Sequence, residues 1–276
     1  MTILVTGATG NVGRAVVDLL LARDVPVRAL SRNPRSLPAE VDVQSADLTD
    51  PSSLGDVLTG VDKVYLYAHP SGVDGFVAAA QDAGVRHVVL LSALAAGDTD
   101  PRNAIAQMHL GVEGAVERSG LAWTFVRPGA FAANALHWAA SIKDSGGVRI
   151  PYAQAQNSSI HELDIAEVSV AALLEDGHEG ETYVLTGPES LTQERQVALI
   201  SAAIGKPLWV EDLTGDDAHA VLTRAFRSPD LVDTRIRYYE QTLSQPDLVS
   251  DTTAKLLGRP GRTFAQWADD HRADFS

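Results

Sequence analysis

The sequence predicts an α/β fold, in which helices cover both faces of a parallel β-sheet. Short runs rich in β-branched residues recur along the first half of the 276-residue chain. Longer segments separate these runs, and their apolar residues recur at helical spacing. The composition agrees with this prediction, because 45% hydrophobic and 21% charged residues are typical of a globular domain.

The first strand is expected at Ile3–Thr6, and the first helix at Asn11–Ala22, where apolar residues at 12, 16, 19 and 20 share one face. Another helix is expected to begin at Asp50-Pro51, because Asp is a favoured N-cap and Pro a favoured first helical residue. Further helices are expected at Gly72–Ala83 and Asn103–Ser119. The remaining strands of this half are expected at Val25–Ser31, Val41–Gln44, Lys63–Tyr67, His87–Leu91 and Ala122–Val126.

The second half is less regular and predicts a smaller, mostly helical part. Asp164 and Glu167 are expected to form a capping box at the start of a helix, and Thr263 and Gln266 form another near the end of the chain. We place a soft boundary near residue 150, between regions 1–150 and 151–276, with a strand near 182–186 returning to the first region. The elements expected in this half are helices at Asp164–Glu175 and Thr192–Ala203 and strands at Thr182–Leu185 and Leu208–Val210.

Composition also excludes several classes of function. The chain has no cysteine, which rules out disulfides, thiolate metal sites and a cysteine nucleophile. With 22 Lys and Arg against 36 Asp and Glu, the net charge of −14 argues against nucleic acid and anionic membranes as partners. No apolar stretch approaches the roughly 20 residues of a membrane span, and no leader pattern stands at the start. We therefore expect a cytoplasmic protein, a monomer or a homodimer, with a small-molecule substrate and no metal.

A glycine-rich loop lies between the first predicted strand and the first predicted helix. Gly7 permits a tight turn, Gly10 allows the backbone to approach a pyrophosphate, and Gly13 allows the helix to pack closely on the strand. The N-terminus of the helix adds free N–H groups and partial positive charge. Because the loop starts a series of alternating strands and helices, it predicts a Rossmann-type, doubly wound, dinucleotide-binding domain. A glycine-rich turn without a ligand is the alternative. The loop residues expected to bind the cofactor are Gly7, Thr9, Gly10, Asn11 and Val12.

The end of the second predicted strand indicates which dinucleotide binds. Domains that prefer NAD usually place an acid there, whereas this chain has Ser31 and Arg32. A guanidinium pairs well with a 2′-phosphate, so Arg32, assisted by Ser31, favours NADP(H). A solvated surface arginine is the alternative.

Several segments together resemble the extended and atypical short-chain dehydrogenases/reductases, and in particular their NmrA-like branch. The resemblance covers nearly the whole chain. It implies NADP(H) as cofactor, Asp47 and Leu48 beside adenine, and Pro128 and Phe131 beside the nicotinamide. The segments that carry it are Thr6–Gly13, Ser31–Pro34, Ala46–Leu48, Asp82–Val85, Ser119–Leu121 with Thr124, Arg127–Gly129 and Asp164–Ala166.

The Tyr-x-x-x-Lys pair by which many short-chain dehydrogenases reduce carbonyls is absent, because no tyrosine has a lysine four residues later. His109 and Glu113 occupy the matching positions, four residues apart on one helix face. His109 is a candidate to donate a proton or orient the substrate, or else a histidine at the edge of the core. We expect Glu113 to face solvent.

Other candidate residues end predicted strands at the edge where ligands bind in such sheets. Ser92 matches the family's serine position facing the nicotinamide, and a serine that only caps the strand end is the alternative. The backbone of Ala68 and His69 is expected to line the cofactor. Phe131, Trp138 and Tyr152 are candidate substrate residues, although such aromatic side chains are as often part of a core.

A hydride donor without a strong proton donor suits a flat, conjugated electrophile such as a quinone or a dye. The sequence therefore predicts an NADPH-dependent oxidoreductase with a substrate-binding C-terminal region. One alternative is a non-catalytic NADP(H)-binding redox sensor that acts on a protein partner. A sugar-nucleotide epimerase is less favoured, since that chemistry usually needs the missing tyrosine and lysine.

Overall fold

The computed structural model describes residues 1–30, 37–67 and 70–276, and the chain divides into two compact units. Each unit is assembled from several segments of the chain. The first unit comprises Met1–Asp98, Ala106–Pro128 and Glu162–Val184. The second comprises Thr99–Ile105, Gly129–His161 and Leu185–Ser276.

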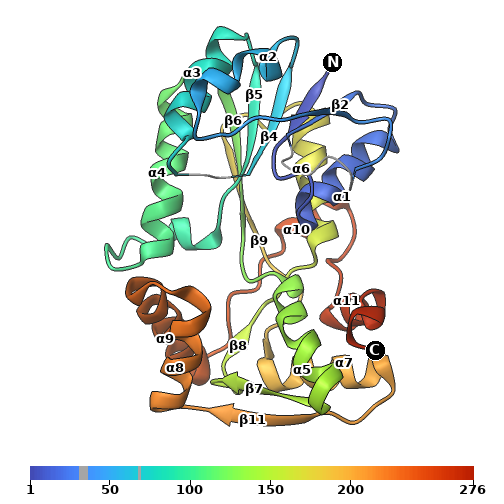
Figure 1. The fold of residues 1–276 in the computed structure, drawn as a ribbon, viewed down its shortest axis with the longest axis vertical. Coiled ribbons are helices and arrows are strands. Elements are labelled where there is room, and N and C mark those ends of the chain that lie inside the picture. Colours follow the sequence, from blue (N-terminus) through green and yellow to red (C-terminus); the bar gives the residue numbers. More distant parts are fainter. Residues whose placement is uncertain (31–36, 68–69) are drawn as a thin grey trace. The chain divides into compact units, whose positions relative to one another are not determined.

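The first unit is built on a seven-stranded sheet in the order β3-β2-β1-β4-β5-β6-β9 (Figure 1). The neighbouring pairs from β3 to β6 are parallel, with Val5 opposite Ala29 on one side and Tyr65 on the other. This order gives a doubly wound sheet, in which ligands bind beyond the carboxyl ends of the strands. The strands are β1 (Ile3–Val5), β2 (Val27–Leu30), β3 (Asp42–Gln44), β4 (Lys63–Tyr67), β5 (His87–Leu91), β6 (Ala122–Pro128) and β9 (Glu181–Leu185).

Helices cover both faces of this sheet, as predicted. Figure 1 shows α1 (Asn11–Leu21) and α6 (Glu162–Leu174) on one face and α3 (Val73–Asp82) and α4 (Ala104–Arg118) on the other. The face under α3 and α4 carries an apolar cluster that includes Phe76 and Phe125. The predicted α/β fold with a parallel sheet is therefore confirmed.

The predicted helix start at Asp50-Pro51 is confirmed, and the predicted capping box at Asp164 is wrong. Asp50 accepts a hydrogen bond from the Ser52 N–H at the start of η2 (Pro51–Ser53), which leads into α2 (Gly55–Leu58). In contrast, α6 begins at Glu162, so Asp164 lies buried inside its first turn. Acidic residues are favoured throughout the first turn as well as at the N-cap, and this similarity explains the misplaced start.

The second unit contains two small two-stranded sheets and several helices. In one sheet β7 (Gly147–Pro151) runs parallel to β11 (Trp209–Leu213), and in the other β8 (Gln156–Asn157) pairs antiparallel with β10 (Leu191–Thr192). Its helices are η4 (Ala132–Trp138), α5 (Ala139–Ser145), α7 (Gln193–Ile204), α8 (Gly215–Phe226), α9 (Pro229–Ser244), α10 (Thr252–Leu257), α11 (Phe264–Asp270) and η5 (Arg272–Phe275).

The core of the second unit gathers around the end of the chain. Trp267 and Phe275 are fully buried there, together with Ile200 and Val197 of α7. The predicted capping box of Thr263 and Gln266 is present and starts α11, which carries Trp267. Among the described helices, none combines the length and the apolar character that a membrane span requires.

Candidate functional site

The glycine loop has the geometry that its spacing predicts. Gly7 has φ +60°, in the left-handed region that favours glycine. The Gly10 N–H donates to the Gly7 carbonyl oxygen over 2.9 Å and closes the turn. A Cβ atom on Gly13 would overlap that same carbonyl oxygen, so α1 packs against the loop with no room for a side chain. Two of the three glycines are thus required by the backbone itself.

The N-terminus of α1 is open to a ligand. Gly10 is its N-cap, no side chain among residues 1–30, 37–67 and 70–276 caps it, and its first turn contains no acidic residue. Thr9, Gly10 and Asn11 are exposed at this point, whereas Val12 is buried beneath them. Uncapped N–H groups at the positive end of a helix bind phosphate oxygens, so this terminus suits the pyrophosphate of a dinucleotide.

Thr6 connects the glycine loop to the end of β4. Its buried hydroxyl accepts a 2.7 Å hydrogen bond from the Tyr67 N–H. The Tyr67 side chain lies close enough that a Cβ on Gly7 would come within 3.1 Å of the Tyr67 Cβ, and the residue is 54% exposed. The predicted residues that follow β2 and β4, namely Ser31, Arg32, Ala68 and His69, lie outside the described residues.

Asp47 and Leu48 follow β3 at the carboxyl edge of the sheet, where they were predicted to lie beside adenine. Asp47 is exposed and accepts hydrogen bonds from the N–H (2.9 Å) and the hydroxyl (2.8 Å) of Thr49. Leu48 packs against the apolar cluster of the first unit. The pair therefore forms a tight turn that presents one polar and one apolar side chain.

A buried hydrogen-bonded network joins Ser92, Glu113 and Arg127. The Ser92 hydroxyl donates to Glu113 Oε1 over 2.5 Å. Arg127 donates to both carboxylate oxygens, from Nε over 2.9 Å and from Nη2 over 2.6 Å. Only 4% of the Glu113 side chain and 19% of the Arg127 side chain are exposed. The expectation that Glu113 faces solvent is therefore wrong, because Arg127 at the end of β6 supplies the countercharge that allows burial.

This network fixes the chemical character of Ser92. Its proton is held by the Glu113 carboxylate, so the hydroxyl oxygen presents lone pairs and acts as an acceptor. The hydrogen bonds to Glu113 raise the pKa of Arg127, which keeps the guanidinium charged. The sequence signal for the network was Arg127 in the Arg-Pro-Gly segment, which the family resemblance assigned only to the loop beside the nicotinamide.

His109 lies on α4 one turn before Glu113 and is half-buried. Its Nδ1 atom is buried and has no hydrogen-bond partner in the described part of the chain. Burial lowers the pKa of His109 below its usual value, and the nearby Glu113 charge opposes this shift. The ring is therefore mostly neutral at pH 7, and the described residues leave one of its nitrogens without a hydrogen bond.

The three aromatic residues predicted to bind substrate have different surroundings within the second unit. Trp138 packs against the apolar core formed around Trp267. Tyr152 instead lies next to Tyr239, with ring centroids 5.8 Å apart. Phe131 is half-buried and forms an isolated β-bridge with Ile160.

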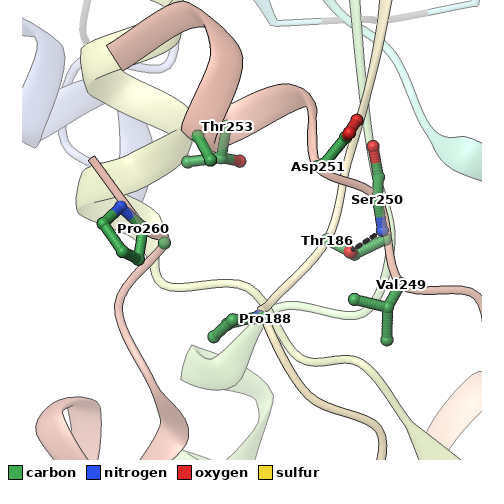
Figure 2. Close-up of a pocket in the computed structure, with 9 residues that line it drawn as sticks. Thr186, Pro188, Val249, Ser250, Asp251, Thr253 and Pro260 are labelled. Atoms are coloured by element: carbon green, nitrogen blue, oxygen red, sulfur yellow. Dashed lines mark hydrogen bonds between the residues drawn. The ribbon is translucent and has the colours of Figure 1, made fainter. Parts of the chain in front are cut away.

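A cavity of about 260 Å³ opens elsewhere in the second unit (Figure 2). One wall is fixed by a 2.8 Å hydrogen bond from the Ser250 N–H to the Thr186 hydroxyl, drawn as a dashed line. None of the residues predicted from the sequence to bind cofactor or substrate lines it. Its lining residues are Thr186, Pro188, Val249, Ser250, Asp251, Thr253, Ala254, Pro260 and Gly261.

Comparison with known protein families shows which family contains this glycine loop. The sequence profile described as NAD(P)H-binding matches residues 7–176, which is more than half of the chain and includes the loop, Ser92, His109, Glu113 and Arg127. The chain belongs to the NAD(P)H-binding family. The predicted cofactor class and the predicted relation to atypical short-chain reductases are thus confirmed.

Three similar proteins match this chain over nearly its full length. The chain is 39% identical to the (4-alkanoyl-5-oxo-2,5-dihydrofuran-3-yl)methyl phosphate reductase of Streptomyces griseus, with 99% of both chains covered. It is 36% identical to the NAD(P)H azoreductase of Xenophilus azovorans, again over 99% of both. Its fold matches a crystal structure of the Escherichia coli NADPH-dependent quinone oxidoreductase in complex with NADPH at a TM-score of 0.81, with 28% identity over 98% and 99% of the chains. The prediction that this family member is an NAD(P)H-dependent oxidoreductase is confirmed.

Proposed function

We propose that this protein uses NADPH to reduce a flat, conjugated electrophile, a quinone-like or dye-like small molecule. The observation that carries the proposal is that both relatives matched over 99% of their length are named as reductases. The first name describes a dihydrofuran ring with an oxo and an alkanoyl group, and the second describes an azo compound. Both are conjugated acceptors of the kind that the missing tyrosine and lysine also favour.

The chemistry of the described residues fits such an acceptor. When bound, NADPH supplies a hydride. A neutral acceptor such as a quinone then needs one proton, whereas a cationic dye needs none. Ser92 does not supply that proton, since its hydroxyl already donates to Glu113. His109 lies on the same helix as Glu113, and its Nδ1 atom has no hydrogen-bond partner among the described residues. It is therefore the better candidate for the proton donor. Quinones and dyes delocalise the charge that hydride brings, so a weak donor or water is sufficient.

Each predicted site residue has a place in this proposal. The open N-terminus of α1 holds the pyrophosphate, the Asp47 turn borders adenine, and Arg32 with Ser31 pairs with the 2′-phosphate. Ser92 and the end of β6 border the nicotinamide. The full set is Gly7, Thr9, Gly10, Asn11, Val12, Ser31, Arg32, Asp47, Leu48, Ala68, His69, Ser92 and Pro128 for the cofactor, His109 and Ser92 for catalysis, and Phe131, Trp138 and Tyr152 for the substrate.

The test of the proposal is consumption of NADPH by the purified protein with a panel of quinones and cationic dyes. We expect the NADPH absorbance to fall with at least one acceptor. Tight NADPH binding together with no consumption across the panel would contradict the proposal and would favour a redox sensor. Comparing the affinities for NADP⁺ and NADPH would then be the next measurement, because a sensor must distinguish them.

The choice of NADPH over NADH is tested at Arg32. Arg32→Ala is expected to weaken NADPH binding about 10- to 100-fold, because a charged hydrogen-bonded pair is lost, and to change NADH binding less than about twofold. Titration of both cofactors against the intrinsic fluorescence of the protein measures the two effects. Arg23→Ala is the control, since Arg23 is exposed and its guanidinium donates to the Leu19 carbonyl of its own helix end. Equal losses for the two cofactors would refute the assignment of Arg32.

The role of His109 is tested by the pH dependence of turnover. Because burial lowers its pKa, the imidazolium becomes populated only at a pH below the usual histidine range. In the wild type, we expect kcat for a quinone to increase as the pH is lowered through that range. In His109→Gln, this increase should be absent, and kcat near pH 6 should be at least about tenfold lower than in the wild type. Affinity for NADPH should remain within about twofold. Identical pH profiles in both proteins would make His109 a packing residue.

A further inference from the structure

A guanidinium group in the second unit is surrounded by aromatic rings. Arg235 on α9 lies 5.6 Å from the ring centroid of Phe226, at the end of α8, and 5.7 Å from those of Tyr238 and Tyr239. Tyr152, directly after β7, adds a further ring beside Tyr239. We refer to Arg235, Phe226, Tyr238, Tyr239 and Tyr152 as the Arg235 cluster.

Arg235 has no anionic partner in the part of the chain that the structure describes. Its contacts there are with the three rings. The arginines Arg28, Arg127 and Arg149 each form an ion pair with a carboxylate. Arg235 is half-buried, and acidic residues outnumber basic ones by 36 to 22 in this chain. A partly desolvated guanidinium without a carboxylate is costly unless a ligand supplies the anion.

One carboxylate that contacts the cluster, Asp247, is already engaged. Asp247 accepts a 2.9 Å hydrogen bond from the Tyr238 hydroxyl and another, also 2.9 Å, from the Ser158 N–H. The hydroxyls of Tyr152 and Tyr239 make no hydrogen bond with the described residues. Burial raises the pKa of Tyr239, and Arg235 opposes this shift, so its hydroxyl remains protonated. Among the described residues, the cluster therefore offers donors from one guanidinium and two phenols, while the Asp247 carboxylate that contacts it is occupied.

The backbone at Tyr152 is held in an uncommon conformation. Its φ of +55° lies in the left-handed region, which costs free energy for a residue with a side chain. Three hydrogen bonds hold this backbone. The Tyr152 N–H donates to the Leu213 carbonyl over 2.9 Å, and the Tyr152 carbonyl accepts from the Ala155 N–H over 2.8 Å and from Gln193 Nε2 over 3.0 Å. This strain places the Tyr152 ring against Tyr239, and strained residues of this kind concentrate at ligand sites.

We propose that the Arg235 cluster binds an oxyanion carried by a flat substrate, such as a carboxylate, sulfonate or phosphate ester. The inference rests on the proposed function, because it makes Tyr152 part of the substrate site. The guanidinium fork matches two anion oxygens, and the rings hold the fork in place while stacking on a planar ligand. A chain with a net charge of −14 otherwise repels anions, so this local cation decides whether an anionic substrate is accepted.

The experiment compares two acceptors that differ in charge. Anthraquinone-2-sulfonate and the neutral 2-(hydroxymethyl)anthraquinone are each assayed with NADPH, using the wild type, Arg235→Gln and Arg235→Lys. In Arg235→Gln we expect KM for the sulfonate to rise about 10- to 100-fold and KM for the neutral quinone to change less than about twofold. Arg235→Lys keeps the charge without the fork and should give an intermediate KM for the sulfonate. Arg224→Gln removes the same charge from an exposed position on α8 and is the matched control.

A binding measurement separates this inference from the proposed function. Naphthalene-2-sulfonate has no reducible group, and its affinity is measured by titration calorimetry. Loss of its binding in Arg235→Gln but not in Arg224→Gln supports the inference even if the wild type reduces neither quinone, an outcome that would count only against the proposed function. Equal affinity in the wild type and Arg235→Gln overturns the inference, whatever the activity. Tyr239→Phe, which removes one donor and keeps the ring, is used if Arg235→Gln fails to fold, and an unchanged affinity then overturns it.

Discussion

Replacing Arg127 with Met is expected to lower the free energy of unfolding by about 3–5 kcal/mol, because it leaves a buried carboxylate without its countercharge. Glu113 would keep only the hydrogen bond from Ser92, and burial prevents water from replacing the guanidinium. Urea denaturation followed by circular dichroism measures this loss. The effect is large because only one member of the pair is removed.

Two further variants show whether burial is the cause. Arg149→Met breaks the exposed ion pair with Glu211, whose side chains are 67% and 47% exposed, and is expected to cost less than about 1 kcal/mol. Adding Glu113→Leu to Arg127→Met should recover part of the lost stability, since no unpaired charge then remains. Equal losses for Arg127→Met and Arg149→Met would show that the buried network does not stabilise the first unit.

Replacing Gly13 with Ala is expected to weaken NADPH binding about 10- to 100-fold, because the new methyl group has to displace the backbone of the glycine loop. Its Cβ would overlap the carbonyl oxygen of Gly7, and forcing atoms into such a contact costs about 1–3 kcal/mol. The loop that presents the N-terminus of α1 to the pyrophosphate would shift. Fluorescence titration with NADPH measures the change in affinity.

The control for this change is a second glycine within a helix. A Cβ added to Gly111 on α4 would meet no atom within 4 Å beyond the backbone of its own helix. Gly111→Ala should therefore leave NADPH affinity unchanged and increase helix stability slightly. Thermal unfolding distinguishes loss of the fold from loss of the loop geometry. A folded Gly13→Ala protein with the affinity of the wild type would mean that the loop does not hold the pyrophosphate.

Buried strands of the first unit were predictable because they are continuous apolar runs. The bounds of Lys63–Tyr67 and His87–Leu91 agree with β4 and β5. The strands of the second unit were mostly missed, since β8 and β10 have two residues each and β7 begins with Gly and ends with Pro. Elements this short carry no periodicity, and tertiary pairing alone determines them.

The candidate site shows the same division between local and distant information. The glycine loop is local, so its spacing predicted its turn and the open end of α1. The burial of Glu113 depends on Arg127, which is fourteen residues away on another element, and no local pattern reports that pairing. Tyr152 was recognised from the sequence as a candidate substrate residue, but the Arg235 guanidinium, which lies near the rings of Phe226, Tyr238 and Tyr239, was not.

The order in which the chain builds its two units limits how it can be divided. The polypeptide enters the second unit at Thr99, leaves it after Ile105 and returns at Gly129. It then goes back to the first unit for α6 and β9, and its last segment, Leu185–Ser276, belongs to the second unit. A fragment that stops near residue 150 would therefore lack the helix that packs beside α1 and the edge strand next to β6. Neither unit corresponds to one contiguous segment of the chain. The first unit, which carries the glycine loop, is complete only after about two thirds of the sequence has been synthesised, at Val184. During translation its sheet therefore cannot add β9 until two segments of the second unit, Thr99–Ile105 and Gly129–His161, have been made.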